Sequence, residues 1–236
     1  MGRNNYFQFK QFRILQERSA MKVGIDGVLL GAWANLEGAK NILDVGTGTG
    51  LLALMAAQKT DAFIDAVELE PEAAAEALQN FNDSPWASRI ALSIGAIQDF
   101  VSENKYDHII SNPPFFENGS KSNNVKRTQA RHSDSLTLKE LLEKSDFLLA
   151  DGGKISLILP SDKEQRLFEV AGTFQLFVSR LFRVAPDQTK KPHRILVELS
   201  KTFGQVVERE FYIRNNGSDA YSDQYRNLTK DFYLAF

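Results

Sequence analysis

Asn41-Ile-Leu-Asp-Val-Gly-Thr-Gly-Thr-Gly-Leu-Leu-Ala-Leu-Met-Ala-Ala-Gln58 is the stretch that decides the fold of this chain. It opens with a short apolar run typical of a buried strand, and residues 51–58 have the composition of a helix. Glycines at alternate positions separate the two parts, and glycine lets a backbone turn sharply and approach a ligand closely. The stretch therefore predicts a strand, a tight turn and a helix N-terminus that together form a ligand site.

The spacing of the glycines indicates which classes of ligand the turn can bind. Gly46, Gly48 and Gly50 form G-x-G-x-G, which differs from the G-x-G-x-x-G of dinucleotide-binding proteins, and no Gly-Lys-Ser/Thr follows as in a phosphate-binding loop. A second apolar run, Ala62–Val67, predicts the next strand and ends at Glu68. An acidic residue about 20 positions beyond such glycines can bind a ribose diol. The pattern predicts a site for a ligand with a ribose diol, and its glycine spacing disfavours NAD.

A second motif, Asn112-Pro-Pro-Phe115, follows the apolar run Tyr106–Ser111, which we also interpret as a buried strand. Two prolines cannot continue a sheet ladder or a helix, and they restrict Asn112 to extended geometry. The chain therefore holds an amide, the carbonyl of Pro113 and an aromatic ring together at the rim of a sheet. Such a set suits the binding of a flat group through an amine on its edge and stacking on its face.

Strands and helices alternate along most of the chain, which predicts a doubly wound, Rossmann-like α/β sheet with helices on both faces. Ligands of such sheets bind at the carboxyl ends of the strands, where the motifs above fall. The other elements that we expect are a helix over Pro71–Asn82, a strand over Ile90–Ser93, a helix over Leu136–Ala150 that Gly152-Gly153 ends, a strand over Lys154–Leu159, a helix that Asp162 caps, and late strands over Gln175–Arg183, Ile195–Ser200 and Val207–Ile213.

Composition excludes several other classes of protein. With 236 residues and 43% hydrophobic content the chain can bury a large core, and it lacks cysteine, which excludes disulfides and cysteine-based zinc sites. Its histidines are scattered, so we expect no metal site. We see neither an apolar stretch of membrane-spanning length nor an N-terminal leader, and we expect a cytoplasmic monomer without a membrane contact. The net charge of −2 leaves a polyanion to be bound by a local basic patch.

Taken together, the motifs resemble those of Rossmann-like S-adenosylmethionine-dependent methyltransferases, and Asn112-Pro-Pro-Phe115 resembles the motif of the branch that methylates amines. The segments 9–12 and 20–33 are similar to the N-terminal signature of the bacterial tRNA1(Val) adenine-37 N6-methyltransferases. This resemblance implies transfer of a methyl group from S-adenosylmethionine to the N6 amine of an adenine beside a tRNA anticodon, leaving S-adenosylhomocysteine. It implies a short N-terminal extension, residues 1–35, that closes over the cofactor site of a methyltransferase domain, residues 36–236.

The same resemblance implies the residues that bind the cofactor. Asp44 meets the amino group of its methionine part, Glu68 binds the ribose, and Ile97 packs on the adenine ring. Ala96 stands where many relatives carry an aspartate that binds the adenine amine, so Asp99 or a backbone carbonyl is expected to replace that contact. The remaining cofactor-binding residues are the loop residues Gly46, Thr47, Gly48 and Gly50, the bordering Asn112, and Lys22, Val23 and Gly24, which close over the cofactor.

For catalysis and RNA binding we expect a further group of residues. The side-chain oxygen of Asn112 and the carbonyl of Pro113 accept hydrogen bonds from the target amine, and Phe115 stacks on the target base. The expected contacts to the RNA are Pro114 and Phe116, the cations of the segment after the motif, Lys121, Lys126, Arg127 and Arg131, and a second basic group, Lys190, Lys191 and Arg194.

Other functions stay open at this point. Motifs of the type Asn-Pro-Pro-aromatic also occur in enzymes that methylate a protein glutamine, the N2 amine of guanine in ribosomal RNA, or adenine in DNA. A non-catalytic module that binds S-adenosylmethionine or RNA on the same fold is a further alternative, but it predicts a damaged glycine loop or a missing Asn112, and the sequence has both intact. An NAD-linked enzyme is disfavoured by the glycine spacing.

Overall fold

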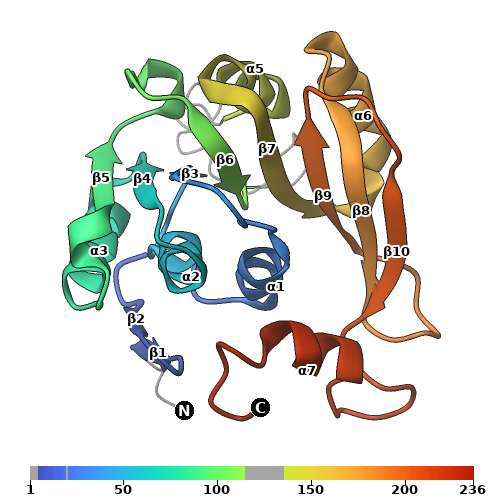
Figure 1. Cartoon of the computed structure of the whole chain (residues 1–236). Helices are drawn as coiled ribbons and strands as arrows, with labels where there is room; N and C mark the ends of the chain where they lie inside the picture. The colour runs from blue at the N-terminus through green and yellow to red at the C-terminus, as the bar shows by residue number, and fades with distance from the viewer. Residues whose placement is uncertain (1–4, 20, 115–135) are drawn as a thin grey trace, which may run out of the picture.

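The computed structural model describes residues 5–19, 21–114 and 136–236. Their main feature is an eight-stranded sheet with the strand order β10-β8-β9-β7-β6-β3-β4-β5 (Figure 1). β9 runs antiparallel to both of its neighbours, and every other neighbouring pair in this sheet is parallel. The strands are β3 (Asn41–Val45), β4 (Phe63–Glu68), β5 (Ile90–Ile94), β6 (Tyr106–Ser111), β7 (Leu149–Pro160), β8 (Phe177–Ala185), β9 (Arg194–Ser200) and β10 (Val207–Tyr212).

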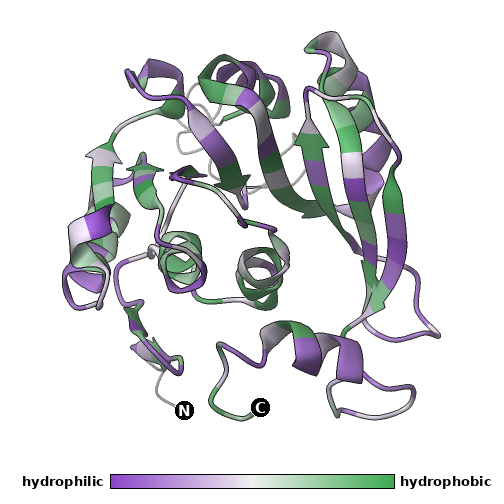
Figure 2. Cartoon of the chain, in the orientation of Figure 1, coloured by the Kyte–Doolittle hydropathy of each residue, from purple (hydrophilic) through white to green (hydrophobic). Residues whose placement is uncertain are grey.

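Helices cover both faces of this sheet, which confirms the predicted doubly wound α/β fold. One face carries α1 (Ile25–Trp33), α2 (Leu51–Lys59) and α3 (Pro71–Asn82), and the other carries α5 (Leu138–Leu148) and α6 (Glu164–Thr173) (Figure 1). Each face has its own buried apolar cluster, because side chains alternate along a strand. Figure 2 shows the hydrophobic residues concentrated along α1, α2 and the central strands.

The two ends of the chain pack against each other beside α1 and α2 (Figure 1). A hairpin of β1 (Tyr6–Gln8) and β2 (Arg13–Leu15) lies near the C-terminal helix α7 (Asp223–Thr229) and the residues that follow it. The Lys10 ammonium donates a hydrogen bond of 2.7 Å to the backbone oxygen of Phe236, and the Phe9 ring stacks on the Tyr233 ring. The N-terminal hairpin is therefore held by the C-terminal segment.

Two glycines bring α1 and α2 into close contact. A Cβ atom on Gly27 would lie 2.9 Å from the Leu51 side chain, and one on Gly31 would lie 2.5 Å from the Met55 sulfur. Lys59 at the end of α2 donates to the carbonyls of Gly31, Ala32 and Ala34, which terminates α1. Because Leu51 directly follows the glycine loop, the start of α1 lies beside that loop.

Several local predictions were wrong. Gly152-Gly153 does not end the preceding helix, which stops at Leu148; the glycines lie inside β7, where the register against β6 shifts between Tyr106 and His108. Asp162 does not cap α6, because Asp162 lies in a 3-10 turn, Ser161–Lys163, and Lys163 occupies the N-cap position. The helices α1 and α7 were missed.

The register shift explains why residue 153 is a glycine, and from it we predict the effect of a substitution there on the stability of the protein. A Cβ atom there would lie 2.9 Å from the Leu149 side chain and 2.9 Å from the backbone oxygen of Tyr106, which cannot move without breaking the sheet. We expect Gly153→Ala to lower the free energy of unfolding by about 1–3 kcal/mol in urea titrations. Gly204→Ala is the control, because nothing lies within 4 Å of its Cβ position. Equal stability of the two variants would contradict the packing role of Gly153.

Candidate active site

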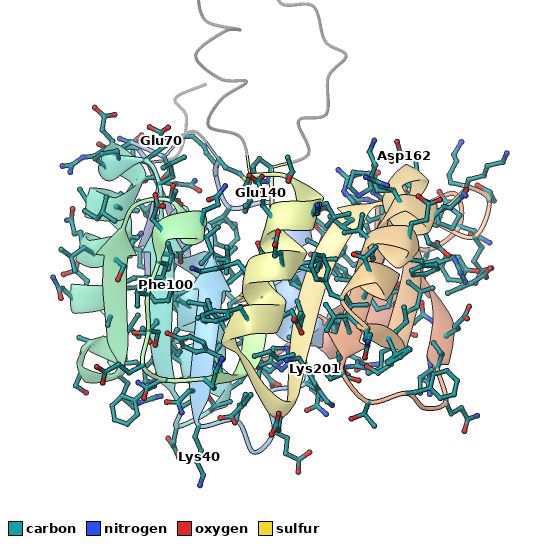
Figure 3. The ribbon with its side chains drawn as sticks, turned by 90° about the horizontal axis from the view of Figure 1, so that it is seen from above. Lys40, Glu70, Phe100, Glu140, Asp162 and Lys201 are labelled. Atoms are coloured by element: carbon teal, nitrogen blue, oxygen red, sulfur yellow. The ribbon has the colours of Figure 1, made fainter. Side chains whose placement is uncertain are left out.

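The predicted motifs meet at one edge of the sheet. The glycine loop follows β3, Glu68 ends β4 and Asn112 follows β6, and these strands are neighbours in the order β6-β3-β4. Since parallel strands point the same way, their carboxyl ends share an edge, and neighbouring strands are about 4.8 Å apart. Figure 3 shows Glu70, Glu140 and Asp162 at this edge, whereas Lys40 and Lys201 lie at the opposite one. The features that the sequence separates by up to 66 positions are thus side by side.

The glycine loop has the backbone geometry of a ligand cradle. Gly46 and Gly48 have φ values of 71° and 57°, in the left-handed region that favours glycine, and no atom of the described residues lies within 4 Å of a Cβ built on either residue. Gly50 has a different role, because its Cβ position is only 2.4 Å from the Phe81 ring. The loop therefore rests on α3 at Gly50 and leaves open space above Gly46 and Gly48.

Asp44 lies directly beneath the loop and is fully buried. One of its carboxylate oxygens, Oδ2, accepts hydrogen bonds from the Thr47 hydroxyl at 2.5 Å and from the backbone N–H of Ala53 at 3.1 Å. The other oxygen, Oδ1, is buried and has no hydrogen-bond partner among the described residues. Burial raises the pKa of Asp44 to about 7, against the opposing effect of the Thr47 and Ala53 donors, and the nearby Glu68 raises it further. An unpaired carboxylate oxygen at this depth fits a cationic ligand group.

Glu68 at the end of β4 is 8% exposed and is held by backbone groups on both sides. Its Oε2 accepts the N–H of Gly48 at 2.7 Å, and its Oε1 accepts the N–H of Glu70 at 2.9 Å. Each oxygen of a carboxylate has a second lone pair, so the carboxylate can still accept two hydroxyl donors. This arrangement fits the ribose diol that the sequence predicted, and it also ties the glycine loop to β4.

Asn112 is the first residue after β6 and is half-buried between the sheet and the two prolines. Ser111 anchors it, because the Ser111 hydroxyl donates a 2.7 Å hydrogen bond to the carbonyl of Val45 in β3. The Oδ1 atom of Asn112 is buried without a hydrogen-bond partner among the described residues. A buried amide oxygen without a donor costs free energy, so its presence at a ligand edge fits an acceptor kept for a substrate amine.

The other predicted cofactor residues lie in the segments that follow β5 and precede α1. Ile97 is 5% exposed and starts the 3-10 helix Ile97–Asp99, for which Ala96 is the N-cap residue. The Asp99 side chain is exposed. The backbone N–H of Asp99 donates a hydrogen bond to the Ala96 carbonyl, which therefore has one lone pair left for a ligand. Lys22–Gly24 precede α1, and they therefore lie at the loop edge where Gly27 contacts Leu51.

Some of the expected RNA contacts lie among the described residues and others lie outside them. Lys190 and Lys191 are exposed in the β8–β9 connection, and the pairing of Arg194 with Pro160 places this connection at the carboxyl end of β7. Arg194 itself forms a 2.8 Å ion pair with Asp26 of α1, which the sequence did not predict. Pro113 is buried and Pro114 is exposed. The predicted contacts outside the described residues are Phe115, Phe116, Lys121, Lys126, Arg127 and Arg131.

Two polar residues of α3 escaped the sequence analysis. Glu76 and Asn80 are 3% and 1% exposed, and they face the N-terminal segment and the glycine loop. Glu76 lies on the same face of α3 as the buried Ala73 and Ala77. A signal was present, because the spacing of these residues puts polar side chains on the buried stripe of an amphipathic helix.

Two further features concern metals and membranes. Across residues 5–19, 21–114 and 136–236, no group of three or more His, Asp or Glu side chains is arranged to hold a metal ion. Within the same ranges no helix has the length and apolar character needed to cross a membrane.

The chain is similar in sequence and in fold to known methyltransferases. The Methyltransferase small domain family matches residues 27–180. The tRNA1(Val) (adenine(37)-N6)-methyltransferase of Parabacteroides distasonis is 42% identical over 98% of both chains, and the protein of that name from Aeromonas salmonicida is 42% identical over 99% of both. A predicted O-methyltransferase from Agrobacterium tumefaciens superimposes with a TM-score of 0.69 at 16% identity, covering 88% of this chain and 96% of its own, which supports the fold alone.

Fold, glycine loop and family match define a Rossmann-like methyltransferase that depends on S-adenosylmethionine. Within this class, the chain belongs to the tRNA1(Val) (adenine(37)-N6)-methyltransferase family.

Proposed function

We propose that this protein transfers the methyl group of S-adenosylmethionine to the N6 amine of adenine 37, beside the anticodon of tRNA1(Val). The relatives of that name match at 40–42% identity over nearly the whole chain. The observation that carries the proposal in this chain is the buried Oδ1 of Asn112 next to the glycine loop, which has no hydrogen-bond partner among the described residues. This oxygen can accept a hydrogen bond from a target amine that enters at the carboxyl edge of the sheet.

The reaction needs orientation more than acid or base chemistry. When bound, S-adenosylmethionine supplies a methyl group that is already activated on a sulfonium sulfur. Asp44 and Glu68 bind and orient the donor, and Asn112 and the carbonyl of Pro113 accept the two hydrogens of the target amine. These acceptors turn the nitrogen toward tetrahedral geometry, localise its lone pair, and stabilise the positive charge that develops on it. The proton of the methylated amine is acidic enough to leave to water.

For the RNA we propose that the described cations at the site edge contact phosphates. Lys190 and Lys191 have exposed side chains at the carboxyl edge of the sheet, whereas Arg194 is already paired with Asp26 and contributes less charge. Pro114 is exposed beside Asn112 and borders the target base. Further contacts are proposed from the sequence alone. Phe115 stacks on the target base, and the RNA is also contacted by Phe116, Lys121, Lys126, Arg127 and Arg131. Less free energy is needed to unstack an adenine from a loop than from a duplex.

The lysine pair makes a prediction about salt. We expect Lys190→Ala/Lys191→Ala to bind tRNA more weakly and with a flatter dependence of log affinity on log salt concentration. Each lost phosphate contact should reduce the slope by about 0.7–0.9. Filter-binding titrations over a range of salt concentrations measure this slope, and Lys40→Ala, at the opposite edge, is the control. An unchanged slope in the double variant would remove these lysines from the RNA surface.

Methyl transfer to RNA tests the function as a whole. The purified protein is incubated with labelled S-adenosylmethionine and total RNA from cells that lack the modification, and the nucleosides are then separated. Label in N6-methyladenosine at position 37 of tRNA1(Val) is the expected result. Label in guanine, or no label in RNA but label in DNA or protein offered as the acceptor in parallel reactions, would assign the site to another planar amine or amide and refute the proposed substrate.

The remaining assignments are part of the same proposal. Residues 1–35 close over the cofactor site of the methyltransferase domain, residues 36–236, and the protein works as a monomer in the cytoplasm, where tRNA is modified. Light scattering of the free protein tests the monomer.

A further inference from the structure

Helix α3 holds the N-terminal segment with a buried carboxylate. The two oxygens of Glu76 accept hydrogen bonds from three consecutive backbone N–H groups, those of Glu17 at 2.5 Å, Arg18 at 2.9 Å and Ser19 at 2.9 Å. None of the ion pairs found in the described part of the chain includes Glu76. Successive backbone N–H groups that converge in this way form an anion-binding concavity, and here the anion is a side chain of the protein itself.

One turn further along α3, Asn80 connects the same segment to the glycine loop. Its Oδ1 accepts the N–H of Leu15 at 2.8 Å, and its Nδ2 donates to the carbonyl of Leu15 at 3.0 Å and to the carbonyl of Thr49 at 2.8 Å. Asparagine is a poor helix former, and Asn80 is 1% exposed, so its place in the helix reflects these contacts. Thr49 lies between Gly48 and Gly50, which makes Asn80 a direct link between the loop and residues 15–19.

The held segment leads directly to the residues beside the donor site. Gln16 is buried and its Oε1 accepts the N–H of Val23 at 2.9 Å, so the backbone at Val23 is tied to the part of the segment that Glu76 and Asn80 hold. Gly24 follows as the N-cap residue of α1, and α1 contacts Leu51 at the end of the glycine loop. The position of Lys22–Gly24 is therefore set from α3 and from α2 together.

We propose that Glu76 and Asn80, named here the α3 clasp, are positioning residues of the methyl-donor site. They touch neither donor nor substrate, and they act through residues 15–19 and Thr49, which place Lys22–Gly24 and the glycine loop opposite each other. This inference depends on the proposed function for the identity of the donor. It adds that donor affinity, rather than the rate of transfer, depends on two buried polar side chains that lie outside the site.

Binding of the product S-adenosylhomocysteine, measured by calorimetry on the full chain, tests the clasp. We expect Asn80→Ala and Glu76→Gln to raise the Kd for the product and the KM for the donor about tenfold or more, with kcat at saturating donor within about threefold of the wild type. Arg89→Ala is the matched control, because it removes two side-chain bonds to carbonyls, those of Ala62 and Ala57, near the opposite edge. A simple loss of stability would affect all three variants alike.

Hydrogen exchange of the wild type gives a second test that needs no variant. We expect the amides of Glu17, Arg18 and Ser19 to exchange more slowly when S-adenosylhomocysteine is bound, because a ligand between Lys22–Gly24 and the glycine loop would stabilise the segment that is tied to both. Folded clasp variants with a Kd within twofold of the wild type, or unchanged exchange at these amides, would overturn the inference. A wild type that binds no product at all would instead refute the proposed donor.

Discussion

Asn112→Ala is expected to lower kcat for methyl transfer by about 100- to 1,000-fold while the Kd for S-adenosylhomocysteine stays near the wild-type value. Removal of one positioned acceptor or donor for the charge that develops in a transition state typically has an effect of this size. In this chain the side-chain oxygen is buried, has no hydrogen-bond partner among residues 5–19, 21–114 and 136–236, and precedes the rigid Pro113-Pro114 pair. Single-turnover kinetics with saturating donor and tRNA measure the rate of the chemical step directly.

The expected separation of rate and binding has a structural reason. Asn112 follows β6, whereas the groups that suit the donor, Asp44 and Glu68, belong to β3 and β4 and have hydrogen bonds of their own. Loss of the amide should therefore leave their geometry unchanged. Asn82→Ala is the control, because Asn82 is exposed at the end of α3. A variant of Asn112 that transfers methyl groups at the wild-type rate would exclude the assigned role.

The sequence predicted the fold and the centre of the site because both depend on local patterns. An apolar run before glycines at alternate positions favours a strand and its turn, and two consecutive prolines cannot continue a sheet ladder. The topology then supplies what the sequence cannot measure: parallel pairing of β6, β3 and β4 brings Asn112, the loop and Glu68 to one edge. The resemblance of the motifs to a known family added the substrate, which none of these patterns determines.

The failures come from long-range contacts. Gly152-Gly153 is a common helix terminator, and only the register of β7 against β6 shows that Gly153 is needed for a close approach to Tyr106. Glu76 looks like a solvated helix acid until the N-terminal segment is seen to donate three N–H groups to it. Arg194 looks like a free cation until α1 places Asp26 beside it. In each case the partner is distant in sequence, so local pattern carries no information about it.

If Asp44 pairs with the amino group of the ligand, as we propose, Asp44→Asn is expected to weaken binding of S-adenosylhomocysteine by about 2 kcal/mol or more, which is about 30-fold, because the variant loses that buried charge. The wild-type affinity should also depend on pH. In the free protein burial raises the pKa of Asp44 to about 7, so below that pH the carboxyl is mostly neutral and must lose its proton before it can pair with a cation. Calorimetry should show affinity rising up to tenfold per pH unit below about 7 and levelling above it.

The sign of the stability effect separates this role from simple unfolding. A carboxyl whose pKa is higher in the folded than in the unfolded protein stabilises the fold at low pH, and this contribution is lost as the pH rises through about 7. Glu68 is the charged neighbour that adds to the effect. Asp44→Asn removes the buried charge, so at pH 8 the ligand-free variant should have a Tm equal to or above that of the wild type although it binds the ligand poorly. A lower Tm, or an affinity in the wild type that does not change between pH 6 and pH 8, would show that Asp44 is a structural residue and not the partner of the donor's amino group.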